Sequence, residues 1–288
     1  MRIGRYLVLA AMVLAPAIGA GCDKAFLFSK EQEIAMGNDA APELEKEFDG
    51  KLDDPSVQNY VHQVGQKLAA VAERDMPYNF AVLRSETPNA FALPGGRVYI
   101  TVGLMRHMEN ERQLAAVLGH EIGHVVRQDN VKGIQRQLGV QVLATIAGTA
   151  LEGSGGQIAS TAAKLAGAMV NLRYDRKQEY RADKCGAVAI AKAGYSPWGT
   201  VEVLQVLYDM DKSEGGSFTE MFQTHPLTSN RIDEARQFVQ DEYASYPASL
   251  PDPNRSSFLT VRSMLGEPKK QPAKSLVPAK QQTLKNRN

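Results

Sequence analysis

Apolar residues recur at three- and four-residue intervals along most of this 288-residue chain, the spacing that places them on one face of an α-helix. The first helix begins at Ser29, where a serine followed by Gln32 three positions later forms a capping-box pattern, and it runs to about Phe48. The second begins at Asp53-Asp54-Pro55, and its apolar face carries Val57, Tyr60, Val61, Val64, Leu68 and Val71. Further helices are predicted at about residues 110–127, 130–150, 157–171, 174–193, 198–211 and 228–243.

Two short segments in the front half of the chain have the character of strands. Tyr78 to Leu83 alternates between apolar and polar positions as a half-buried strand does, and Arg97 to Thr101 is rich in β-branched and aromatic residues. Pro94-Gly95-Gly96 marks a turn between two strands, and the segment Asn89 to Leu93 leads into it. The predicted fold class is therefore α+β, mostly helical, with one small sheet.

The amino terminus resembles an export signal. Residues 1–5 are a short basic leader, and the apolar run from Tyr6 to Ala20 is shorter than the roughly 20 residues of a membrane-spanning helix. Gly19-Ala20-Gly21 precedes Cys22, which resembles a bacterial lipoprotein signal, although Gly19 stands where such signals usually have a Leu-like residue. A disulfide between Cys22 and Cys185 is the alternative use of this cysteine. We expect residues 1–21 to be a signal peptide and Cys22 to carry a lipid anchor on an exported, periplasmic protein.

Two segments lack helical periodicity. Glu152-Gly-Ser-Gly-Gly156 is predicted to be a flexible connector, and residues 246–288 collect prolines and end in a basic stretch that predicts a disordered tail. The main folded domain is thereby expected to span residues 22–245. Lys and Arg number 33 against 32 Asp and Glu, so the net charge of +1 gives no reason to expect a nucleic-acid partner.

The sequence His120-Glu-Ile-Gly-His124 contains the candidate metal-binding residues. Residues four apart share a helix face, so His120 and His124 can present two imidazoles to one ion with Glu121 beside them. The residues before and after this sequence are apolar, which predicts a buried helix. Two ordinary core histidines and a chance glutamate are the alternative, but a buried Glu121 without a partner would be costly. The pattern therefore predicts a hydrolytic zinc site with one ion per chain.

A catalytic zinc with two histidines usually has a third protein ligand. One class of enzymes places it six residues after the second histidine, and Asn130 at that position excludes this class. Downstream, Asp175, Glu179 and Asp183 are spaced four apart and fall on one helix face. An ordinary solvated face is the alternative explanation, with neighbouring basic residues neutralising it. The spacing alone does not choose among the three acids.

Several segments together resemble the M48 family of zinc endopeptidases, which includes bacterial periplasmic lipoprotein peptidases. The likeness covers roughly residues 30–243 and lies in Leu118–His124, Glu179–Asp183, Asn89–Gly96, and His225-Pro226 with Arg231. This resemblance implies a zincin-like (gluzincin) core in which a small antiparallel sheet packs on the helix with the HExxH sequence.

The resemblance also implies individual roles. Glu179 would be the third zinc ligand beside His120 and His124, and Asp183 would orient a ligand histidine. His225 and Arg231 would stabilise the oxyanion, and the strand at Asn89 and Ala90 would pair with the backbone of a polypeptide substrate. An exposed strand edge offers such pairing with little demand on sequence.

Two other functions compete with an endopeptidase. An exported zinc-binding lipoprotein acting as a chaperone or assembly factor would have a non-catalytic site, but a structural zinc site needs no glutamate beside it. A membrane-embedded protease would need long apolar spans, whereas Val140 to Leu151 covers about 12 residues and suits a core helix. We therefore expect an endopeptidase for exported or membrane-associated proteins, misfolded ones included, with Glu121 activating a zinc-bound water.

Overall fold

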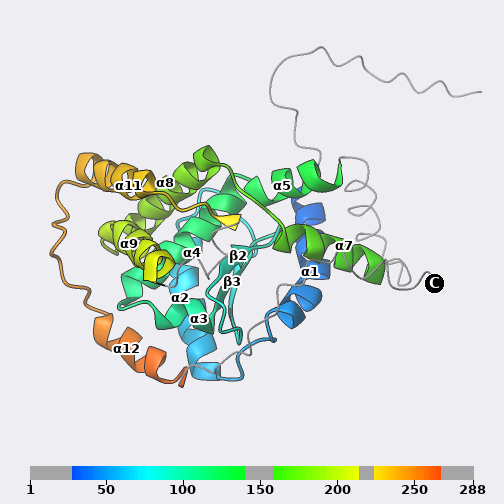
Figure 1. Ribbon diagram of the computed structural model, residues 1–288, viewed down its shortest axis with the longest axis horizontal. Helices are drawn as coiled ribbons and strands as arrows, with labels where there is room; N and C mark the ends of the chain where they lie inside the picture. The colour runs from blue at the N-terminus through cyan, green and yellow to red at the C-terminus, as the bar shows by residue number, and fades with distance from the viewer. Residues whose placement is uncertain (1–27, 140–157, 214–223, 267–288) are drawn as a thin grey trace, which may run out of the picture.

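A computed structural model describes residues 28–139, 158–213 and 224–266 of the chain (Figure 1). The expected signal peptide, Cys22, the connector Glu152–Gly156 and the basic stretch after residue 266 lie outside the described residues, as do the predicted helical residues 140–150. Among the described helices, none is long and apolar enough to cross a membrane.

Helices make up most of the described structure, as predicted. The first two begin where expected: Ser29 and Gln32 form the capping box of α1, and the Asp54 side chain accepts from the backbone N–H groups at the start of α2. The short helices α3 and α12 were not predicted. The helices are α1 (Lys30–Glu47), α2 (Pro55–Ala69), α3 (Val102–Arg106), α4 (Glu111–Val126), α5 (Asp129–Leu138), α7 (Ile158–Val170), α8 (Arg176–Lys192), α9 (Trp198–Ser213), α11 (Ser229–Glu242) and α12 (Arg255–Ser263).

The sheet has three strands, β1 (Asn79–Leu83), β2 (Ala90–Ala92) and β3 (Arg97–Thr101), in the order β1-β3-β2. β2 and β3 form the antiparallel hairpin predicted around the turn at Pro94-Gly95-Gly96. β1 and β3 are parallel, so the expectation of an antiparallel sheet is wrong in this respect and the sheet is mixed. The reason is topological: β2 runs opposite to β1, and the hairpin then inserts β3 between them in the direction of β1.

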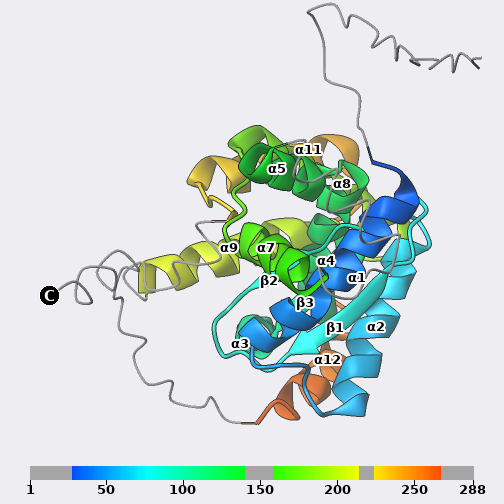
Figure 2. The same ribbon diagram turned by 90° about the vertical axis from the view of Figure 1, so that its right-hand side faces the viewer.

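Both faces of the sheet are covered by helices. Phe80, Val82 and Ile100 face a core shared with α2, α3 and α4. Ala81 and Tyr99 point to the opposite face, into a second core shared with α1, α5 and α7, and Figure 2 shows α1 and α7 side by side there. Four of the five residues of β1 are consequently buried, and the predicted half-buried strand is buried on both sides.

Helix α12 belongs to the folded body, so the prediction of a disordered tail from residue 246 is wrong for residues 255–265. Phe258 is fully buried in the core that contains α2 and α4, with Val261 and Leu265 beside it. Burying such a phenylalanine stabilises the fold by about 2–3 kcal/mol. The preceding Asn254 side chain donates to Glu111 Oε1 at 2.9 Å, which fastens this segment to the start of α4.

Candidate metal centre

Helix α4 brings two imidazoles together at the centre of the molecule. It starts at the cap residue Asn110, whose side chain accepts from the backbone N–H of Gln113, and nearly all of its residues are buried. One helical turn separates His120 from His124, and their Nε2 atoms lie 3.1 Å apart. Glu121 projects beside them, is 3% exposed, and lines a pocket with His120.

Helix α8 supplies the carboxylates. Exposed Asp175 is its N-cap and forms a capping box with Gln178, so this acid serves the helix end rather than the site. Glu179 follows one turn later and is fully buried, with Oε1 at 3.3 Å from His124 Nε2 and Oε2 at 3.6 Å from His120 Nε2. The spacing of Asp175 and Glu179 does not distinguish them, but the structure does: Asp175 caps helix α8, and Glu179 faces the histidines.

Glycines allow α4 and α8 to cross closely enough for these side chains to meet. A Cβ atom at Gly186 would lie 3.0 Å from the backbone nitrogen of His120, and one at Gly123 would lie 3.1 Å from the carbonyl oxygen of Ala182. Real Cβ atoms rarely tolerate such contacts with backbone. Gly123, the glycine in HEIGH, is therefore needed for the site, because it allows the backbone of α8 to lie close to the helix that carries the histidines.

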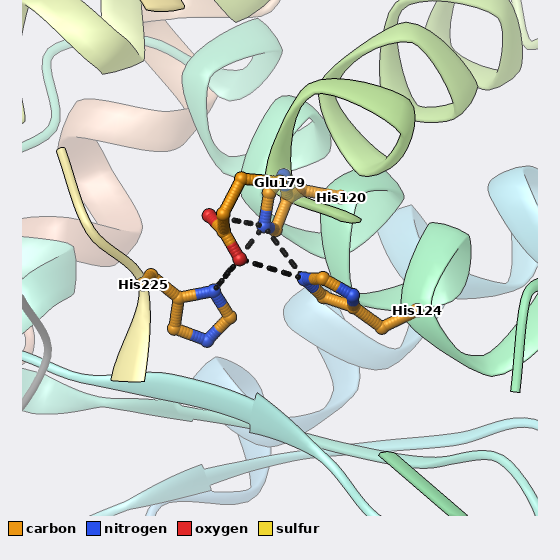
Figure 3. A group of neighbouring side chains, drawn as sticks. All are labelled: His120, His124, Glu179 and His225. Atoms are coloured by element: carbon orange, nitrogen blue, oxygen red, sulfur yellow. Dashed lines mark hydrogen bonds and ion pairs between the residues drawn. The ribbon is translucent and has the colours of Figure 1, made fainter. Parts of the chain in front are cut away.

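His225 joins the group from the irregular segment before α11. Its Nδ1 lies 3.0 Å from Glu179 Oε1 and 3.4 Å from His120 Nε2. Figure 3 shows the side chains of His120, His124, Glu179 and His225 pointing toward one another, and their ligand atoms all lie within 4.8 Å of each other. The sequence resemblance gave His225 a place near the site, and the structure places it at ligand distance.

Each helical histidine has a carboxylate behind it. Asp183 Oδ1 lies 2.9 Å from His120 Nδ1, as the resemblance suggested for a ligand histidine. Asp129 Oδ2 lies 3.2 Å from His124 Nδ1, and sequence reasoning missed this residue. Tyr174, also missed, stacks on His124 with ring centroids 3.9 Å apart. The only sequence signal for Asp129 is an acid five positions after His124, beyond the predicted helix end.

Arg231 of α11 is occupied by carboxylates. Its Nε and Nη2 donate to the two oxygens of Asp183, both at 2.8 Å, and its Nη1 lies 2.6 Å from Glu179 Oε2. Nη1 also donates to the carbonyl oxygen of Pro226 at 3.3 Å. This geometry argues against the expected role of Arg231 as an oxyanion donor. The guanidinium instead fixes the two acids that face His120.

Neighbouring charges and hydrogen bonds shift the pKa values of Glu179, Asp183 and His124. Burial favours the neutral form of Glu179, yet the charges of His225 and Arg231 hold its pKa well below the usual value. Burial acts likewise on Asp183, and Arg231 and His120 lower its pKa. Burial opposes the charge on His124, but hydrogen bonds to Asp129 and Glu179 prevail and raise its pKa to about 9. Both acids are consequently carboxylates at neutral pH, as metal ligation and its support require.

The residues present fit a zinc ion. Imidazoles and one carboxylate are the donor set of hydrolytic zinc sites. Glu121 Oε2 is buried and has no hydrogen-bond partner in the described structure, which is costly unless a further group sits beside it. A bound metal ion would be coordinated by the cluster of ligand atoms, and a water molecule on it could donate a hydrogen bond to Glu121 Oε2.

The sheet edge next to the site is β2. The backbone carbonyl of Asn89 accepts from the N–H of Thr101, and its own N–H donates to the Thr101 side chain. In an antiparallel pair every second residue bonds to the partner strand, so the N–H and C=O of Ala90 face the outer edge. Ala90 lines the pocket whose walls also include His120, Glu121 and His225. Of the two expected substrate-pairing residues, Ala90 is the one whose backbone groups point away from β3, and it is 3% exposed at the pocket wall.

Two histidines and a carboxylate at ligand distance, with a glutamate at a pocket wall whose Oε2 has no hydrogen-bond partner among the described residues, are the features of a metal-dependent hydrolase. Residues 55–239, more than half of the chain, match the M48 family of peptidases, and the chain belongs to this family. The cluster of imidazoles and carboxylate described above agrees with membership of this peptidase family.

Three relatives place the chain within the family. It is 30% identical to the beta-barrel assembly-enhancing protease of Yersinia pestis over 237 residues, which are 80% of this chain and 48% of that protein. It is 28% identical to the mitochondrial metalloendopeptidase OMA1 of Arabidopsis thaliana, with 75% and 42% covered. The metalloprotease YcaL of Escherichia coli (strain K12) is 28% identical, with 81% and 88% covered. The chain thus spans about half the length of the Yersinia protein.

Proposed function

We propose that this chain hydrolyses internal peptide bonds with Glu121 as the general base, at a zinc ion held by His120, His124 and Glu179. The observation that carries this proposal is the buried, unpartnered Oε2 of Glu121, located at the wall of a pocket and next to the ligand atoms. A non-catalytic zinc site would not need this carboxylate. The alternative of a chaperone or assembly factor with such a site is therefore not favoured.

The proposed mechanism assigns a task to each side chain. Zinc, when bound, lowers the pKa of water toward about 7 and polarises the scissile carbonyl. Glu121 accepts the proton of the attacking water and later passes it to the leaving amine. Asp183 holds His120, and Arg231 holds Asp183 and Glu179 in place. None of these steps requires a covalent intermediate with the protein.

His225 remains the candidate donor to the developing oxyanion. A catalytic zinc keeps one position open, so four protein ligands would leave no room for the reaction. His225 is the one of the four that lies outside a helix, between residue 224 and α11, and its Nε2 lies 3.8 Å from Glu121 Oε1. We propose that it turns from the ligand group toward the substrate during the reaction, where its N–H stabilises the carbonyl oxygen.

The substrate is proposed to bind as an extended strand along β2. Pairing with the outward-facing backbone groups of Ala90 would give affinity without a demand on sequence, which suits segments of unfolded polypeptides. The adjoining pocket is lined by Val117, Val203, Leu204, Leu207 and Leu227, which suit an apolar side chain. Exported or membrane-associated proteins, misfolded ones included, are the proposed substrates, and the Yersinia relative is named a beta-barrel assembly-enhancing protease, which supports a role in protein assembly.

Removal of the metal tests the proposal directly. The purified full chain should contain about one zinc and cleave casein, a permanently unfolded protein. Treatment with a strong chelator should reduce cleavage at least 100-fold, and adding zinc back should restore it, because the metal and Glu121 act together. Metal content by mass spectrometry and peptide release by chromatography are the measurements. Cleavage that persists in the zinc-free protein would contradict the proposal.

We also propose export and lipid anchoring at Cys22, which rests on the amino-terminal sequence alone. Expression of the whole chain in a bacterium should yield a mature protein that begins at Cys22 and carries acyl chains. Mass spectrometry of the amino-terminal peptide measures this, and Cys22→Ala should leave the protein without the added mass. An unmodified Cys22 in the mature protein would refute the anchor.

A further inference from the structure

Asp129 is a buried carboxylate to which the mechanism above gives no task. It is 1% exposed and begins helix α5, directly after the turn that ends α4. Its Oδ2 lies 3.2 Å from Nδ1 of His124, and its Oδ1 accepts from Gln178 Nε2 at 3.0 Å. Both oxygens are thus used inside the protein, one of them by a proposed zinc ligand.

We propose that Asp129 is a positioning residue for His124, an inference that rests on the proposed zinc site. Because the Asp129 oxygen accepts a hydrogen bond there, Nδ1 of His124 carries a hydrogen, which leaves Nε2 as the nitrogen that can bind a metal ion. That Nε2 faces the ligand group, 3.1 Å from His120 Nε2. The stacked ring of Tyr174, at an interplanar angle of 10°, fixes the plane of the imidazole. Asp129 thereby does for His124 what Asp183 does for His120.

The orientation of Asp129 is set by the start of helix α8. Gln178 is 3% exposed, and its Oε1 accepts from the backbone N–H of Asp175 in the capping box. This bond directs the NH₂ group of Gln178 away from the cap and toward Asp129. The cap of α8 therefore orients both Glu179, which follows Gln178, and the carboxylate behind His124.

The backbone before Asp129 is strained and is held from the other side. Gln128 has φ +56° and ψ +29°, a left-handed conformation that is unfavourable for a residue with a side chain. Its side chain donates to Glu33 Oε1 at 2.6 Å, and buried Glu33 is bound by Arg74 at 2.8 and 2.9 Å. Arg74 also donates to the carbonyl oxygen of Val125, the residue after His124.

Strain of this kind persists where the surroundings fix it, and it clusters at functional sites. Here the surroundings include Glu33 of α1, which lies outside the matched residues 55–239. The support of His124 is therefore built partly from a helix beyond the family match. This network joins α1, the end of α4 and the starts of α5 and α8 behind one ligand.

Replacement of Asp129 by Asn is the sharpest test. Asn keeps the shape but has one accepting oxygen for two donors, so either His124 Nδ1 or Gln178 faces an NH₂ group. We expect Asp129→Asn to weaken zinc binding 10- to 100-fold in competition with a chelator, the usual effect of removing such a support. The visible absorption bands of the Co²⁺-substituted protein should change as well. Asp175→Asn is the matched control, because Asn also caps helices and the residue contacts the same Gln178.

The outcomes separate the two proposals. Wild-type protein without stoichiometric zinc would refute the zinc site itself. Zinc bound by the wild type and equally well by Asp129→Asn, with an unchanged Co²⁺ spectrum, would refute the role of Asp129 alone. Gln178→Met serves if Asp129→Asn does not fold, since it leaves the carboxylate but frees its orientation. It should weaken zinc binding about three- to tenfold, and unchanged zinc affinity would overturn the positioning role.

Discussion

Glu121→Gln should reduce the rate of peptide hydrolysis by a factor of about 10²–10⁴ while the protein keeps its zinc. The substitution preserves the shape of the side chain but removes its capacity to accept a proton. Glu121 is not among the four residues whose atoms converge at ligand distance, so zinc binding should not change. Its Oε2 has no partner in the described structure, and no hydrogen bond of that oxygen is lost. The measurements are kcat/KM on an unfolded protein substrate and zinc per chain.

The control for this prediction is Glu109→Gln, the same change at an exposed residue just before the start of α4. It should leave both activity and zinc content at the wild-type level. Cleavage by Glu121→Gln at the rate of this control would remove Glu121 from the mechanism. Loss of zinc from Glu121→Gln would instead show that the carboxylate helps to hold the metal.

The local parts of the site were predictable from the sequence, because one helical turn determines them. His120, Glu121 and His124 need only the geometry of α4 to share a face. The distinction between Asp175 and Glu179 was also present in the sequence, as a capping-box pattern of Asp175 with Gln178. The four-residue spacing does not distinguish Asp175 from Glu179, whereas the capping-box pattern identifies Asp175 as the N-cap.

The nonlocal parts were not predictable in this way. The pairing of Asp129 with His124 depends on the left-handed turn at Gln128, and that turn depends on contacts with α1. The parallel pairing of β1 with β3 depends on where the hairpin inserts. Phe258 could be assigned to the core only once α2 and α4 provided a surface for it. Each of these features joins segments far apart in the sequence, and periodicity carries no information about such contacts.

Glu179→Ala should weaken zinc binding and Asp175→Ala should not, although the two acids lie one turn apart. Glu179 is fully buried between His124, His225 and Arg231. Its removal deletes a proposed zinc ligand, so zinc affinity should fall by at least 100-fold. It also leaves the buried Arg231 charge less compensated, which should lower the free energy of unfolding by about 3–5 kcal/mol.

Asp175→Ala removes the N-cap of α8 and should lower the free energy of unfolding by about 1 kcal/mol. Its zinc content should stay at the wild-type level, because the exposed side chain lies outside the ligand group and the backbone N–H of residue 175, which holds Gln178, is retained. Chelator competition for zinc affinity and urea denaturation for stability measure the two effects separately. Equal zinc affinity in the two variants would refute Glu179 as the ligand. Zinc loss from Asp175→Ala alone would mean that the cap, through Gln178 and Asp129, dominates the geometry of the site.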